Sequence, residues 1–264
     1  MYEKNRRVGR DAAAGAAAEE TEGQLEGRNA LQEALKSGRT VDKVFIAAGE
    51  IDRGLQRLAA EAKEAGAVVV PVDRRKLDAM SFTHAHQGVI AQAAAHVYYS
   101  IDDILEEAAS RGEAPLIVIC DELSDPHNLG AILRSAECAG AHGVIIPKRR
   151  SVGLTATVAK ASAGAVEYMK VARVTNISAA IGELKEKGVW VFGTAAEGSI
   201  PMYQADLSGP TAIVIGNEGA GLSQLVRKNC DVMVNIPMRG RLSSLNASAA
   251  ASILLYEALR QRLG

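Results

Sequence analysis

Three polar segments in the second half of the chain carry residue types that could do chemistry. The first, residues 125–136, contains Asn128 and Arg134 and leads from an apolar run into a predicted helix. Polar groups at such a junction lie at the carboxyl edge of a sheet, where open α/β folds bind ligands. Taken alone, Asn128 could equally be a helix cap, and a single arginine on a helix is usually solvated.

The second segment, residues 213–222, places three glycines after an apolar strand. Gly216, Gly219 and Gly221 permit a tight turn and a close approach of the backbone to a ligand. Their spacing differs from the dinucleotide-binding pattern G-x-G-x-x-G, and the chain has no G-x-x-x-x-G-K-[ST] phosphate loop. This argues against a nicotinamide-dependent oxidoreductase. Glu218, within the turn, could simply cap the helix that follows.

The third segment, residues 236–250, leads from a strand into the last helix. It carries a cluster of hydroxyl and amide side chains, namely Ser243, Ser244, Asn246 and Ser248. N-capping would explain some of them, but the cluster is more polar than a cap needs.

The elements that must position these segments fall into two α/β groups. In the first, apolar periodicity predicts helices over 28–36 and 52–65 and strands over 41–47, 67–70 and 88–94, the second strand ending at Pro71. In the second, strands are predicted over 116–120, 143–146, 168–171, 189–194, 212–216 and 232–234, and helices over 129–139, 155–162, 177–187, 222–228 and 246–262. This alternation predicts a mostly parallel sheet with helices on both faces.

The expected domain organisation follows from these groups. Residues 1–22 are Ala-rich and charged and are expected to be a flexible tail. Residues 23–99 form a small α/β domain, residues 100–113 a linker with a helical turn over 101–108, and residues 114–264 the larger domain.

Composition indicates the cellular compartment of the protein more clearly than its activity. The three cysteines are far apart and form no C-x-x-C pair, and His84, His86 and His96 lack metal-ligand spacing, so neither a disulfide framework nor a metal site is expected. Without a signal peptide or a long apolar run, a cytoplasmic location is expected. The net charge of -1 does not by itself point to a nucleic-acid partner, so any nucleic-acid contact must come from local patches of charge.

The three segments, in this order, resemble the signature motifs of the SPOUT superfamily, and more narrowly those of the SpoU (TrmH/RlmB-type) RNA ribose 2′-O-methyltransferases. The resemblance covers residues 114–264. The opening Glu26-Gly27-Arg28-Asn29-Ala30 and the later His86-Gln87-Gly88 resemble the small, L30e-like substrate-binding domain of the branch that methylates a guanosine in large-subunit (23S) ribosomal RNA.

This resemblance implies a deep trefoil knot in the larger domain, a homodimer formed through the knotted region, and S-adenosylmethionine (AdoMet) as methyl donor. By the same analogy, the AdoMet site comprises Thr194, Ala195, Gly216, Asn217, Glu218, Gly219, Ile236, Met238, Ser244, Leu245 and Asn246.

For catalysis, the family assigns activation of the ribose hydroxyl to the position of Arg134, surrounded by Asn128, Glu218, Ser244 and Asn246. Because a guanidinium is effectively always protonated, we expect Arg134 to stabilise a developing alkoxide rather than to remove the proton. The proton acceptor stays open among Glu218, an RNA phosphate and water.

RNA contacts are expected from basic and polar side chains in three places: Arg28 and Asn29, the run Lys148, Arg149 and Arg150, and the pair Arg239 and Arg241. A solvated charged loop is the alternative for the run at 148–150. Alternatives for the whole protein are a methyltransferase of another ribosomal RNA site or of tRNA, and an RNA-binding module without catalysis.

Overall fold

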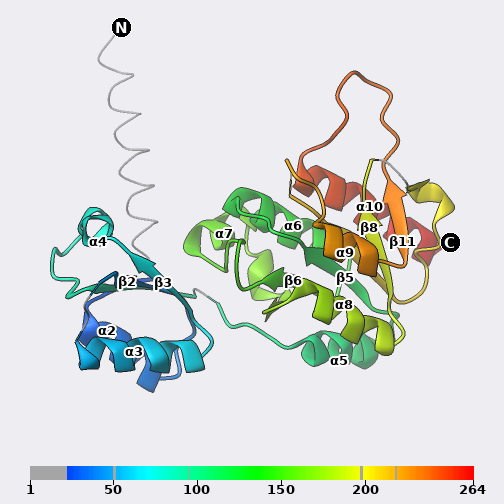
Figure 1. The fold of residues 1–264 in the computed structure, drawn as a ribbon. Coiled ribbons are helices and arrows are strands. Elements are labelled where there is room, and N and C mark those ends of the chain that lie inside the picture. Colours follow the sequence, from blue (N-terminus) through cyan, green and yellow to red (C-terminus); the bar gives the residue numbers. More distant parts are fainter. Residues whose placement is uncertain (1–22, 50–51, 95, 197–198, 218) are drawn as a thin grey trace, which may run out of the picture. The chain divides into compact units, whose positions relative to one another are not determined.

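The computed structural model describes residues 23–49, 52–94, 96–196, 199–217 and 219–264. The expected tail, residues 1–22, lies outside them. The described residues form two compact units (Figure 1). One comprises those up to Val97 together with Leu154–Thr157, and the other comprises Tyr98–Gly153 and those from Val158 onwards.

The first unit is a four-stranded mixed sheet with the strand order β1-β4-β2-β3. Its strands are β1 (Gln24–Glu26), β2 (Val41–Ala47), β3 (Val68–Val72) and β4 (Val89–Ala93), and its helices are α2 (Arg28–Lys36), α3 (Arg53–Glu64) and α4 (Arg74–Met80). The apolar sides of α2 and α3, with Leu31 and Leu55, are buried in one core cluster with β2 and β4. Leu77 of α4 is buried in a second cluster, with Ile90 of β4.

Two features of this unit differ from the predictions. The strand expected to end at Pro71 continues to Val72. Because β3 is an edge strand of the sheet, a proline without an N–H is tolerated there. Strand β1 and helix α4 were not predicted; β1 has only three residues, and α4 begins at a cap in which the Asp73 side chain accepts a hydrogen bond from the Arg75 amide at 2.8 Å.

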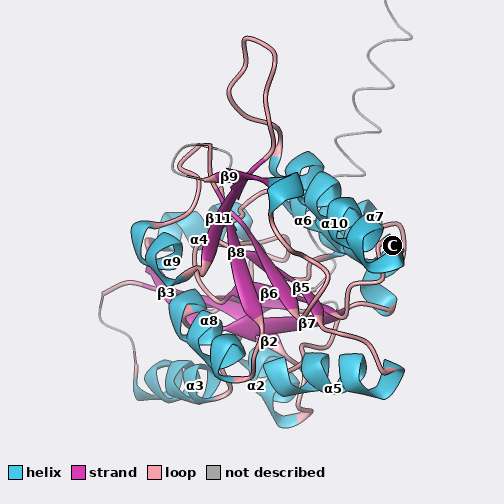
Figure 2. Cartoon of the chain, turned by 90° about the vertical axis from the view of Figure 1, so that its right-hand side faces the viewer, coloured by secondary structure: helices cyan, strands magenta, loops and turns pink. Residues whose placement is uncertain are grey.

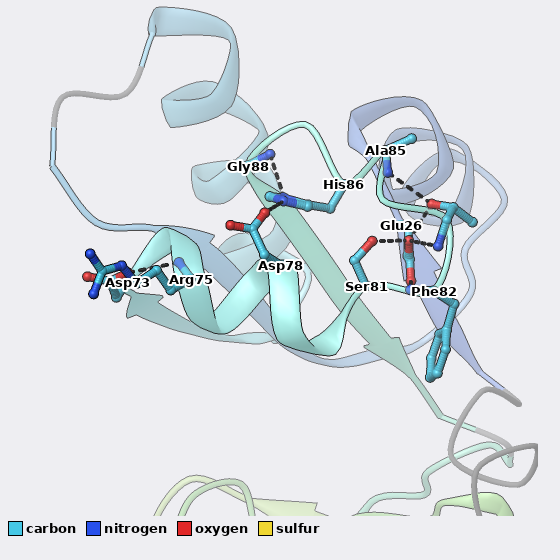
Figure 3. Close-up of polar contacts among 10 residues, drawn as sticks. Glu26, Asp73, Arg75, Asp78, Ser81, Phe82, Ala85, His86 and Gly88 are labelled. Atoms are coloured by element: carbon cyan, nitrogen blue, oxygen red, sulfur yellow. Dashed lines mark hydrogen bonds and ion pairs between the residues drawn. The ribbon is translucent and has the colours of Figure 1, made fainter. Parts of the chain in front are cut away.

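The carboxylate of Glu26 organises the loop that follows α4 (Figure 3). It accepts hydrogen bonds from the Ser81 hydroxyl at 2.7 Å, the Phe82 amide at 2.7 Å, and the Thr83 amide at 3.1 Å and hydroxyl. Partial burial raises the pKa of Glu26, but hydrogen bonds from Thr83, Phe82 and other donors outweigh it and lower the pKa from 4.5 to about 2.

A Glu26→Gln variant should loosen this loop in a pH-dependent way. Because the folded-state pKa is lowered, the carboxylate stabilises the fold above pH 4.5, and this contribution is lost as the pH falls from 4.5 towards about 2. Amide exchange over residues 81–88 should therefore be faster in the variant at pH 7. The difference from the wild-type protein should shrink as the pH approaches 2; a difference that persists undiminished there would contradict the prediction.

The second unit is a seven-stranded sheet with the order β7-β6-β5-β10-β8-β11-β9, and all its strand pairs are parallel. The strands are β5 (Leu116–Cys120), β6 (Gly143–Pro147), β7 (Lys170–Val174), β8 (Trp190–Thr194), β9 (Ile200–Pro201), β10 (Thr211–Ile215) and β11 (Val232–Asn235). The helices are α5 (Ile101–Arg111), α6 (Pro126–Cys138), α7 (Ala156–Ala161), α8 (Ile177–Glu186), α9 (Gln224–Asn229) and α10 (Ala247–Leu263), with short 3-10 turns at Ala165–Glu167 and Met202–Gln204.

Helices cover both faces of this sheet, as predicted. Ile104 of α5, Ile181 of α8 and Val226 of α9 share one buried cluster with the strands. Helices α6 and α10 pack together on the opposite face, joined by a hydrogen bond of 2.7 Å between the hydroxyls of Ser135 and Ser252 (Figure 2). The carboxyl ends of the parallel strands therefore share one edge of the sheet.

The stretch expected to be a linker, residues 100–113, contains the whole of helix α5. Ser100 and Asp103 form a capping box at its start, and Gly112 ends it in the left-handed conformation. Ile104 is fully buried against the sheet. This segment is thus a structural part of the second unit. No helix among the described residues is long and apolar enough to cross a membrane.

Candidate active site

A cavity of about 640 Å³ lies at the carboxyl ends of β8, β10 and β11. Nine of the residues predicted to bind a cofactor line it: Thr194, Ala195, Gly216, Asn217, Gly219, Ile236, Met238, Ser244 and Leu245. Residues that were not predicted also line it: Ala196, Ile215, Ala220, Gly221, Val234, Asn235, Ser243, Ala247, Ala250 and Leu254. The second and third polar segments thus meet at one site. Of the other two predicted residues, Asn246 is not among those lining the cavity, and Glu218 lies outside the described residues.

The turn after β10 forms one wall of the cavity, and its geometry requires glycine at position 216. A Cβ on Gly216 would lie 2.4 Å from the carbonyl carbon of Gly221. The turn is closed by two backbone hydrogen bonds between Asn217 and Gly221, of 3.1 and 2.8 Å, and the Asn217 side chain donates to the carbonyl of Glu122 at 3.1 Å. The chain folds back tightly here, which leaves backbone groups at the cavity wall.

The third segment forms a long loop between β11 and α10, drawn in orange in Figure 1. Residues 237–246 are all exposed, and the side chain of Leu242 is 78% exposed. Arg239 and Arg241 form no hydrogen bond or ion pair with any described residue. These two arginines are therefore available to an external ligand.

Asn246 and Asn128 join the third segment to the first. Asn246 donates from Nδ2 to Oδ1 of Asn128 at 2.9 Å, while its own Oδ1 caps α10 by accepting from the amides of Ser248 and Ala249. Asn128 is buried and is not a helix cap; Asp125 caps α6 by accepting from the His127 amide at 2.8 Å. Helix α6 accordingly begins three residues earlier than predicted, with Pro126 in its first turn.

Substitutions of Asn246 should separate its two contacts. Asn246→Ala removes both the cap and the link to Asn128 and should lower the free energy of unfolding by about 1–3 kcal/mol. Asn246→Asp keeps the cap but cannot donate to Asn128, so it should retain the part of this stability that comes from the cap. Urea denaturation of both variants beside the wild-type protein measures the two contributions, and equal losses in both would show that the cap contributes nothing.

The structure does not bring Arg134 to this cavity. Its side chain is exposed on α6, does not line the cavity and forms no hydrogen bond or ion pair with any described residue. Of the predicted catalytic residues, Asn128 and Asn246 are in contact and Ser244 lines the cavity. The single chain therefore assembles the cavity but leaves Arg134 outside it, exposed on α6.

The predicted RNA-binding side chains differ in their exposure and in whether another residue already pairs with them. Arg150 forms an ion pair of 2.9 Å with Glu122, while Arg149 is exposed and Lys148 half-buried. Asn29 is exposed, and Arg28 is engaged within its own unit. Arg149 and Asn29 are therefore free to contact a ligand, whereas Arg28 and Arg150 are already paired.

Asp121 is a positioning residue that the sequence reasoning missed. It directly follows β5, is 4% exposed, and accepts a hydrogen bond from the Ser223 amide at 2.8 Å. It thereby fixes the chain just after the glycine turn. A carboxylate at the end of a fully apolar strand was the available signal.

A parallel α/β unit with a cavity at its carboxyl edge, preceded by a small mixed-sheet unit, is typical of two-domain proteins that bind a small ligand. Residues 115–256 match the model of the SpoU rRNA methylase family, and residues 24–99 match the model described as RNA 2′-O ribose methyltransferase substrate binding. The chain belongs to the SpoU family and is an RNA ribose 2′-O-methyltransferase.

Individual relatives agree with this assignment. The chain is 48% identical over 236 residues to YacO of Bacillus subtilis, described as a TrmH family tRNA/rRNA methyltransferase, with 89% of this chain and 94% of that protein covered. It is 44% identical over 225 residues to the 23S rRNA (guanosine-2′-O-)-methyltransferase RlmB of Ralstonia nicotianae, covering 85% and 89%.

Two solved structures share the fold along nearly the whole chain. The SpoU methyltransferase AviRb of Streptomyces viridochromogenes, in complex with AdoMet, has a TM-score of 0.57 and 26% identity, with 91% of this chain and 90% of that chain covered. An AdoMet-bound rRNA methyltransferase of Sinorhizobium meliloti has a TM-score of 0.56 and 27% identity, covering 91% and 88%.

Proposed function

We propose that this methyltransferase uses AdoMet and methylates the ribose of a guanosine in large-subunit (23S) ribosomal RNA in the cytoplasm. The observation that carries the proposal is the cavity where the second and third segments meet, in a chain 44% identical to an RlmB protein over 225 residues. In this proposal residues 23–99 bind the RNA and residues 114–264 catalyse the transfer of the methyl group.

The residues at the cavity fit AdoMet. A volume of about 640 Å³ suits a cofactor of this size. Ile236 and Leu245 offer apolar walls to an adenine ring, and the backbone of the 216–221 turn offers polar groups to its edge. Two related structures contain AdoMet. When bound, AdoMet supplies an activated methyl group.

The protein's own contribution is to hold the two reactants in line and to stabilise charge on the ribose oxygen. Positioning of this kind lowers a barrier by up to roughly 7–11 kcal/mol. Arg134 stabilises the developing alkoxide as a permanent cation, and the contact between Asn128 and Asn246 holds the first and third segments together. Glu218, an RNA phosphate or water accepts the proton.

A homodimer with a deep trefoil knot is part of the same proposal. Helix α10 buries Leu254 and Leu255 but leaves Ile253 and Tyr256 exposed, and it packs beside α6 with its exposed Arg134. Large apolar side chains left exposed on such a helix are typical of an interaction surface, and a second copy of the chain is the expected cover. The knot is expected from the resemblance of residues 114–264 to the family, and strand β11 lies between β8 and β9, which precede it in the chain. Light scattering should give twice the mass of one chain.

A second candidate function is methylation of tRNA or of another ribosomal RNA site. It is favoured by the 48% identity to YacO, which is described as a tRNA/rRNA methyltransferase.

Mapping of 2′-O-methyl groups across ribosomal RNA and tRNA decides between the candidates. In cells lacking the protein, the proposal expects the loss of one methyl group at a 23S guanosine, restored by the wild-type gene and not by Arg134→Ala. Loss of a methyl group from tRNA would establish the second candidate instead. An unchanged map would contradict both.

A further inference from the structure

The first unit contains a cavity of about 440 Å³, far along the chain from the methyltransferase motifs. Its apolar lining is Ala47, Leu55 and Gly88, and its polar lining is Arg28, Asp52, Arg74 and Gln87. Apolar side chains together with a few polar groups are typical of a site for a small organic ligand.

The guanidinium of Arg28 is fixed at this cavity, and three of its five N–H groups are engaged. Nη1 and Nη2 donate to the two carboxylate oxygens of Asp52 at 2.9 and 2.6 Å, and Nε donates to the carbonyl of Gln87 at 3.3 Å. Its charge is therefore balanced by Asp52, which weakens its attraction for a phosphate. Arg28 still offers a ligand its flat face, on which RNA bases commonly stack, and two N–H groups.

Arg74 offers the complementary chemistry. It lines the same cavity, is exposed and forms no hydrogen bond or ion pair with any described residue. An exposed, unpaired guanidinium that lines a cavity is suited to a phosphate group.

The loop that carries Gln87 is held in a conformation that few residues adopt. His84 and Gln87 have φ values of 53° and 49°, although neither is glycine. Glu26 fixes the start of the loop, and the buried His86 ring fixes its end by accepting from the Gly88 amide at 3.1 Å and contacting Asp78 at 2.8 Å (Figure 3). Strain kept in place by such a network is typical of ligand sites, since a rigid loop loses little entropy on binding.

We infer that this cavity receives one unstacked nucleobase of the substrate RNA, stacked against Arg28, with the adjoining phosphate on Arg74. The inference rests on the proposed function, because it takes RNA as the ligand. It gives the first unit a defined contact to a single nucleotide.

The direct test uses NMR of the full chain with S-adenosylhomocysteine added to occupy the cofactor cavity. The probes are the four nucleoside 5′-monophosphates, and ribose 5-phosphate as the probe without a base. At least one nucleotide should shift the signals of Arg28 Nε–H and the Gly88 amide, and ribose 5-phosphate should shift them far less. Equal shifts with ribose 5-phosphate would show that the cavity binds the phosphate and not the base, which would contradict the inference. No shift with any nucleotide would also overturn it.

The kinetic test uses large-subunit ribosomal RNA from cells lacking the protein. Ala47→Leu fills the cavity and Arg74→Ala removes the phosphate contact. Since stacking of one base changes affinity roughly 5- to 150-fold, Ala47→Leu should raise KM for RNA by about that factor without changing kcat or the Kd for AdoMet. Arg74→Ala should raise the same KM by about tenfold.

Arg75→Ala is the matched control, because Arg75 neighbours Arg74 on α4 but does not line the cavity. Its KM should stay at the wild-type value. If Ala47→Leu does not fold, the comparison of Arg74→Ala with Arg75→Ala still decides, and equal KM values for those two would contradict the inference. If no RNA is methylated at all, the proposed function fails, whereas the nucleotide titration still tests the cavity.

Discussion

Replacing Arg134 by alanine should lower methyl transfer to RNA by roughly two to three orders of magnitude and leave the Kd for AdoMet unchanged. Arg134 is exposed and does not line the cofactor cavity, so its loss removes no contact to the cofactor. Removal of one group that stabilises a developing oxyanion typically costs this much in rate. Single-turnover methylation of RNA and calorimetric titration of AdoMet measure the two effects separately.

Glu137→Ala is the matched control for this experiment. Glu137 is also exposed on α6, one turn further along, and removing it should leave the rate within a factor of two or so, as surface changes usually do. Arg134→Lys keeps the positive charge but loses the planar fork, so it should recover only part of the rate. Wild-type turnover by Arg134→Ala would remove Arg134 from the mechanism.

Replacing Gly216 by alanine should abolish tight binding of AdoMet. The added Cβ would lie 2.4 Å from one backbone carbon and 2.6 Å from the carbonyl oxygen of Gly221, and these are backbone atoms that cannot rotate away. The turn must therefore open, and it forms a wall of the cavity. We expect affinity for AdoMet to fall at least tenfold and the free energy of unfolding to fall by about 1–3 kcal/mol, as overpacking commonly costs.

Gly209→Ala is the control for this substitution. Gly209 lies two residues before β10, and a Cβ there meets no atom within 4 Å. Its AdoMet affinity should match that of the wild-type protein in the same calorimetric titration. If Gly216→Ala bound AdoMet as tightly as Gly209→Ala, the 216–221 turn would not be part of the cofactor site.

Much of the fold could be predicted because the strands of the second unit are short, apolar and separated by amphipathic helices. Strands β2 and β5 have the predicted bounds, and so does α2. Helix α5 could not be recognised in full because its polar, capped start resembles a linker and its burial depends on the sheet. The extension of β3 through Pro71 depended on its edge position, which only tertiary structure defines.

The candidate site was predictable where backbone sterics require particular residues. The crowding at Gly216 and the capping by Asn246 follow from local chemistry, and both residues stood out in the sequence. The contact between Asn246 and Asn128 joins residues 118 positions apart, and no local pattern specifies it. The position of Arg134 relative to the cavity could not be predicted. The helical period predicts only that the side chain is exposed, and not which other surface it faces.

Helix α5 also determines where a fragment of the second unit can begin. Ile104 of α5 is fully buried against the sheet, and Tyr99, just before the helix, is bridged to Ala172 of β7. A fragment that begins at residue 114 would lack both contacts and would expose to solvent the apolar surface that α5 covers. A fragment that begins at Tyr98 keeps them, so the independently folding methyltransferase unit includes α5.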